Sequence, residues 1–108
     1  NGAGAPTTFV ITRRWLITRI INYHWNDAKG VEPGWIALKA ADGTLYGPWW
    51  AVGQEGYMGV PNAYWVVTPD GAIPAGIYTV IDSDPMTWSQ NEGTEGRGMT
   101  WGYGMEME

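Results

Sequence analysis

The feature that most constrains this chain is a succession of short β-branched and aromatic runs, separated about every 8–12 residues by Gly, Pro, Asn or Asp. Such runs favour strands, and the residues between them favour turns. No stretch convincingly predicts a helix. The sequence therefore predicts an all-β fold: a two-sheet antiparallel β-sandwich, Ig-like or jelly-roll, of about seven strands. A flattened barrel is the alternative.

The expected strands are, in order, 7–11, 15–25, 35–40, 45–52, 63–68, 77–82 and 99–104. Asp42 and Gly43 separate the third run from the fourth and form a strong hairpin signal. Pro48 lies inside the fourth run, which predicts an edge strand or a bulge there. Residues 69–76 are expected to form a turn.

Strand alternation divides the longest run, 15–25, into two faces. One face carries Trp15, Ile17, Arg19, Ile21, Tyr23 and Trp25, and the other carries Leu16, Thr18, Ile20, Asn22 and His24. Because the first face is the more apolar, it is predicted to point at the core, with Arg19 as an awkward member.

Chain length limits the number of domains, and net charge limits the classes of partner that the protein can bind. The 108 residues predict a single domain, 1–108, with a flexible N-terminal arm (1–6) and a loose C-terminal tail (105–108). The net charge of −5 argues against binding to nucleic acid or to anionic lipid. No apolar run approaches the ~18 residues of a membrane helix. Since the chain begins at Asn1, we expect a signal peptide to have been removed or the chain to have been trimmed.

The residues available for catalysis are few. The chain has no cysteine and a single histidine, His24, which a triad would have to combine with Ser83 or Ser89. Neither serine lies in a nucleophile elbow. A glycosidase pair drawn from acids such as Asp82 and Glu92 would need a cleft that a small sandwich rarely frames. The sequence predicts a protein that is not an enzyme.

The stretch after the sixth run is rich in oxygen ligands, and Asp82 and Asp84 are the candidate residues for calcium. The spacing does not match an EF-hand loop. A structural turn with solvated acids is the favoured interpretation, and calcium is the alternative cofactor.

Aromatic content gives the better functional lead, since the chain has eight Trp and six Tyr but one Phe. Indole and phenol rings bind the apolar faces of sugars, while nearby amides and carboxylates bond the hydroxyls. The candidate ligand-binding residues lie in or beside predicted loops: Trp25, Trp50, Tyr57, Trp88, Gln90 and Asn91. Trp88 is expected to be the best exposed ring, and a Trp that pins its loop by packing is the competing interpretation.

Three stretches resemble secreted bacterial β-sandwich accessory modules of the carbohydrate-binding kind. They are IPAGIYTVIDSD (73–84), NYHWNDAKGVEPGWIALKAADGTLYGP (22–48) and DPMTWSQN (84–91). The resemblance implies an extracellular β-sandwich that binds a polysaccharide or glycan, and it carries over no catalytic residue.

Self-assembly is the second functional hypothesis. Edge strands with exposed rings can pair with copies of the same chain. The protein would then be a homo-oligomeric subunit of an extracellular filament or surface layer.

Overall fold

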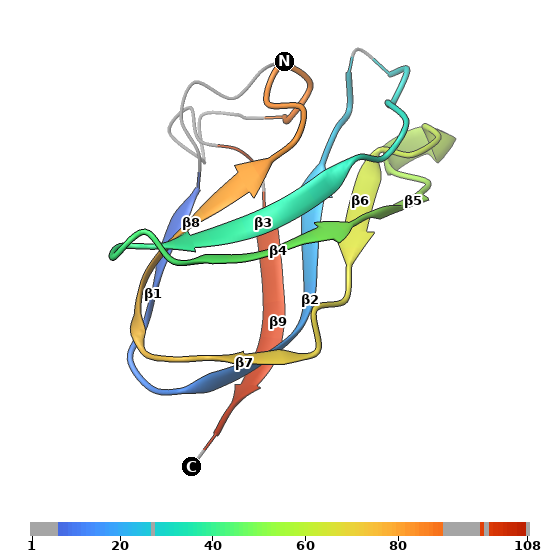
Figure 1. Ribbon diagram of the computed structural model, residues 1–108. Coiled ribbons are helices and arrows are strands. Elements are labelled where there is room, and N and C mark those ends of the chain that lie inside the picture. Colours follow the sequence, from blue (N-terminus) through green and yellow to red (C-terminus); the bar gives the residue numbers. More distant parts are fainter. Residues whose placement is uncertain (1–6, 27, 90–97, 99, 108) are drawn as a thin grey trace.

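The computed structural model of the chain describes residues 7–26, 28–89, 98 and 100–107 (Figure 1). Two antiparallel sheets pack face to face, which confirms the predicted β-sandwich. The predicted N-terminal arm, 1–6, lies outside the described residues. Among those described, nine strands and one short 3-10 turn, Tyr57–Gly59, make up the regular structure.

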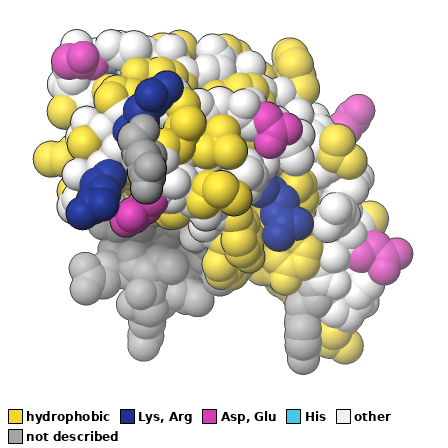
Figure 2. All heavy atoms as spheres, turned by 90° about the horizontal axis from the view of Figure 1, so that it is seen from below, with side chains coloured by type: hydrophobic (Ala, Val, Ile, Leu, Met, Phe, Trp, Pro, Cys, Tyr) yellow, Lys and Arg dark blue, Asp and Glu magenta, His cyan; other side chains and the backbone are white. Residues whose placement is uncertain are grey.

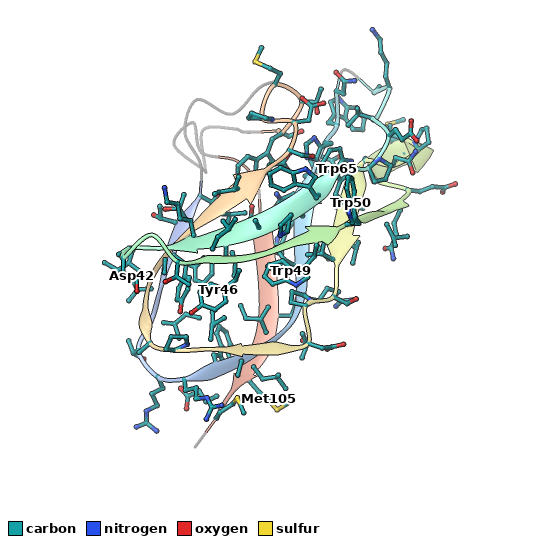
Figure 3. The ribbon with its side chains drawn as sticks, in the orientation of Figure 1. Asp42, Tyr46, Trp49, Trp50, Trp65 and Met105 are labelled. Carbon is teal, nitrogen blue, oxygen red and sulfur yellow. The ribbon has the colours of Figure 1, made fainter. Side chains whose placement is uncertain are left out.

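The first sheet has the order β1-β8-β3-β4. Its strands are β1 (Thr8–Ile11), β8 (Gly76–Asp82), β3 (Trp35–Ala40) and β4 (Leu45–Trp50). The hairpin predicted at Asp42-Gly43 joins β3 to β4, and Asp42 lies near its tip (Figure 3). Pro48 lies on an edge strand, as expected, and the register between β3 and β4 shifts between Ile36 and Leu38.

The second sheet is built around β2 (Trp15–Tyr23). β6 (Tyr64–Val67) and β7 (Gly71–Ile73) pair with successive parts of β2, and β9 (Thr100–Glu106) pairs along nearly all of it. Because a strand has two edges, β6 and β7 must follow each other along one edge while β9 occupies the other. β5 (Val52–Gln54) extends the sheet beyond β6.

Several predicted boundaries were wrong. The run 45–52 is two strands, because the chain leaves the first sheet after Trp50 and enters the second at Val52. The expected turn at 69–76 contains β7. The C-terminal tail was placed at 105–108, but β9 continues to Glu106, because its pairing with β2 extends to Trp15.

The core lies between the sheets. Its buried members are Ile11, Ile17, Ile20, Ile36, Leu38, Trp65, Val67, Ile73, Tyr78, Val80 and Trp88. Tyr46 and Trp49 point from β4 toward this core and pack against it (Figure 3). The core therefore draws on both sheets and on the segment that follows β8.

The predicted inward face of β2 was wrong beyond Ile17. The β2–β9 register shifts between Ile17 and Arg19, as at a β-bulge, which inserts a residue and reverses the alternation. Ile17 and Ile20 are both buried, whereas Arg19 is exposed. From Ile20 onward the even-numbered residues point inward, and Tyr23 is carried to the outer face of the sheet.

Candidate functional site

Four aromatic side chains form a connected cluster on the outer face of the second sheet. Tyr23 stands at the centre, with its ring centroid 5.0 Å from Tyr64, 6.3 Å from Trp25 and 6.4 Å from Trp101. Tyr64 and Trp101 are 6.2 Å apart. We call Tyr23, Trp25, Tyr64 and Trp101 the aromatic platform. It combines rings from β2, β6 and β9 with Trp25, which lies two residues beyond the end of β2.

Strand register explains why these rings meet. Tyr23 pairs directly with Tyr64 on β6, and directly opposed residues share one face of a sheet. Trp101 pairs with Ile21, which lies two residues before Tyr23 and therefore on the same face of β2. The edge-on angles of Trp101 to Tyr23 and Tyr64, 82° and 70°, are a favoured aromatic geometry.

The aromatic platform is accessible and has polar neighbours. Trp101 is 40% exposed, and Tyr23, Trp25 and Tyr64 are partly exposed. Exposed Gln54 pairs with Tyr64 across the β5–β6 ladder. These features combine apolar ring surface with a hydrogen-bonding amide.

A cation lies farther along the same face. The guanidinium carbon of Arg19 lies 4.5 Å from the ring centroid of Tyr103, and Tyr103 pairs with Arg19 across the β2–β9 ladder. This cation–π contact holds the positive charge of Arg19 beside Tyr103, which lies two residues from Trp101 on β9.

The predicted ligand-binding residues do not form one site. Trp25 belongs to the aromatic platform, as a partly buried ring. Trp50 is exposed, as expected, but lies on β4 in the other sheet (Figure 3). The Tyr57 side chain and the residues Gln90 and Asn91 lie outside what the structure describes.

The expectation that Trp88 is an exposed ring is wrong, since it is 2% exposed and belongs to the core. Two hydrogen bonds hold its neighbour Ser89 against β2: Ser89 N–H donates to the Tyr23 carbonyl, and Trp25 N–H donates to Ser89 Oγ. Gly98 lies directly on the indole, where a Cβ would fall 2.0 Å from Trp88 Cε2. Trp88 therefore packs inward and pins the segment after β8.

Asp82 forms the centre of a buried polar network, which composition and spacing did not predict. Its Oδ2 accepts hydrogen bonds from Asn22 Nδ2 at 2.8 Å and from His24 Nε2 at 2.6 Å. Its Oδ1 accepts one from Asp84 N–H at 2.8 Å. Both carboxylate oxygens of Asp82 are thus engaged within the protein.

The rest of the network joins distant segments. His24 Nδ1 lies 2.7 Å from Thr87 Oγ1, and the His24 ring stacks on Trp65 with centroids 3.7 Å apart. Thr100 donates from its hydroxyl to Asn22 Oδ1 at 2.7 Å. β2, β9 and the segment after β8 are therefore connected through side chains.

The order Asp82, His24, Thr87 matches the connectivity of an acid–base–hydroxyl triad. The side chains of Asp82 and His24 are nevertheless completely inaccessible to solvent, so a substrate cannot reach the imidazole. We assign these residues a structural role. Calcium at Asp82 and Asp84 stays a prediction; among the described residues no group of three or more His, Cys, Asp or Glu side chains is placed to hold a metal ion.

Comparisons with protein-family models, curated proteins and solved structures found no match to this chain. Within the described part of the chain, no helix has the length and apolar character needed to cross a membrane.

Proposed function

We propose that this protein is a non-catalytic carbohydrate-binding module that holds a glycan on the aromatic platform. The observation that supports this is the cluster of partly exposed rings contributed by three neighbouring strands of one sheet face. The resemblance to extracellular accessory modules supports the same function and an extracellular location.

The chemistry of the face fits a sugar. Ring faces of Tyr and Trp pack against the apolar C–H faces of a pyranose while their polar edges stay hydrated. Gln54 lies beside Tyr64 and offers an amide that both donates to and accepts from hydroxyl groups. Because the platform is a sheet face and not a deep pocket, it suits an extended polysaccharide better than a free monosaccharide.

Native affinity electrophoresis over a panel of soluble neutral and acidic polysaccharides tests this function. We expect at least one glycan to retard the wild type, and Trp101→Ala to weaken binding about tenfold, equivalent to ~1.4 kcal/mol for one lost stacking ring. Trp50→Ala is the matched control, because Trp50 is more exposed than Trp101 (74% against 40%) but lies on the other sheet.

The control should bind within twofold of the wild type. Circular dichroism of all three proteins shows whether the fold is intact. The proposal is refuted if no polysaccharide retards the wild type, or if both Trp variants lose binding equally.

A self-assembling subunit is the second candidate, supported by exposed apolar side chains on the first sheet. Val10 and Ile77 face each other across β1 and β8 and are 68% and 54% exposed, and Leu45 on β4 is 53% exposed. Figure 2, which views the molecule from below, shows apolar side chains reaching the surface among scattered charged ones at that end of the molecule. Light scattering over a concentration series tests this candidate: growing particles support it, and a monomer at every concentration contradicts it.

A further inference from the structure

The second sheet carries little charge on the face that holds the aromatic platform. Among the described residues, its five strands contain two charged side chains, Arg19 and Glu106. Glu106 is the last residue of β9, and its carboxylate lies 4.0 Å from the Arg13 guanidinium. Arg19 is exposed and shares the outward face of β2 with Ile21 and Tyr23, from which it is separated by steps of two residues. A positive charge therefore lies beside the platform on the same sheet face.

The position of Arg19 is set relative to the exposed rings. Its guanidinium carbon is 4.5 Å from the ring centroid of Tyr103, which is 42% exposed. Tyr103 and Trp101 are two residues apart on β9, a step of about 7 Å along one face of a strand. Neighbouring sugar residues of a polysaccharide are spaced on this scale. A glycan that runs along β9 with a sugar on Trp101 therefore brings a neighbouring sugar to Arg19.

The guanidinium of Arg19 is available to an anion. The ion pairs of the described residues, at Glu106 and at Asp82, do not involve Arg19. A guanidinium holds its N–H donors in its own plane, so it can contact a ring with its face and an acceptor with its edge. That edge matches the two oxygens of a carboxylate, which it binds through two parallel hydrogen bonds. The side chain can therefore keep its contact with Tyr103 while it binds a carboxylate.

We propose that the glycan held on the aromatic platform is acidic: a polysaccharide of uronic acid, with a sugar packed on Trp101 and the carboxylate of a neighbouring sugar bound by Arg19. This inference rests on the proposed function and names the substrate class of the same site. A uronate carboxylate pairs with the edge of the guanidinium, whereas a neutral sugar offers it no anion. The net charge of −5 opposes this binding weakly, because charges farther away than about 8 Å are largely screened at physiological ionic strength.

Isothermal titration calorimetry tests the substrate class with hexasaccharides of galacturonate, mannuronate and glucuronate, each as the free acid and as its methyl ester. Esterification removes the charge and keeps the sugar rings. EDTA is present so that no divalent cation bridges protein and ligand. At low ionic strength we expect the wild type to bind at least one acid about fivefold more tightly than its ester, which is the effect of one exposed ion pair. Arg19→Gln should abolish this preference.

Lys39→Gln is the matched control, because it removes the same charge from an exposed position on β3 in the other sheet. It should keep the preference for the acid, whereas Trp101→Ala should weaken the binding of acid and ester alike. Equal affinity for acid and ester, or an equal effect of the Arg19 and Lys39 substitutions, overturns the proposal and leaves the proposed function standing. Binding of neutral polysaccharides without binding of any uronate has the same consequence. If no saccharide of either kind binds, the proposed function itself fails, and this inference fails with it.

Discussion

Replacing Asp82 with Asn should be the most informative single change in the core. The carboxylate accepts three hydrogen bonds, from Asn22, His24 and the Asp84 main chain, and its side chain has no solvent exposure. An amide has one oxygen, so it cannot replace both acceptor atoms. Whichever way it turns, its NH₂ group faces at least one donor that the carboxylate had satisfied.

The cost follows from these contacts. A hydrogen bond to a charged group contributes about 1.5–3 kcal/mol, and a buried donor left unpaired costs a similar amount. We expect Asp82→Asn to lower the free energy of unfolding by about 3 kcal/mol. For a domain of this size, at about 4 °C per kcal/mol, the melting temperature falls by about 12 °C.

Guanidinium denaturation at pH 7, followed by Trp fluorescence, measures this loss, and calorimetry gives the melting temperature. Asp84→Asn is the matched control, because Asp84 joins the network through its main-chain N–H and carbonyl. It should change stability by less than about 0.5 kcal/mol. A loss below about 1 kcal/mol for Asp82→Asn, or an equal loss for Asp84→Asn, would refute the assignment of Asp82 as the centre of the network.

Three further outcomes are expected from the packing. Trp88→Ala should lower the free energy of unfolding by about 3–5 kcal/mol in urea denaturation, because it empties a buried indole site, and a loss below about 1 kcal/mol would show that the ring is exposed. Burial raises the pKa of Tyr78, so wild-type stability should fall as the pH rises above about 10, where the unfolded chain loses the phenol proton first. Tyr78→Phe should have a free energy of unfolding about 1 kcal/mol lower than that of the wild type at pH 7, because it loses the hydrogen bond to the Pro74 carbonyl. The difference in melting temperature between the two proteins should become smaller at alkaline pH. A difference that stays constant contradicts this reasoning. Gly30→Ala should lower the melting temperature, since φ is +65° and a Cβ would lie 1.7 Å from the Pro61 carbonyl oxygen; an unchanged value would show that the loop relaxes freely.

Local pattern was enough to predict much of the fold. The alternation of strand runs and turns predicted an antiparallel sandwich, and the Asp42-Gly43 hairpin and the edge position of Pro48 were correct. These features depend on residues close together in the chain, whose preferences for turn and strand conformations are intrinsic. β5 and β7 were missed, because three-residue strands carry too little pattern to separate from turns.

The site depended on contacts between residues far apart in the chain. The register shift between Ile17 and Arg19 reverses the faces of β2, and it is defined by pairing with β9, some eighty residues away. Trp88 is buried because Ser89 bonds to β2, a contact that composition does not reveal. The sequence by itself determined that this protein is an antiparallel β fold rich in Trp and Tyr. Only the tertiary structure decided which rings face solvent, because a single inserted residue reverses the period-two alternation that assigns side chains to a face.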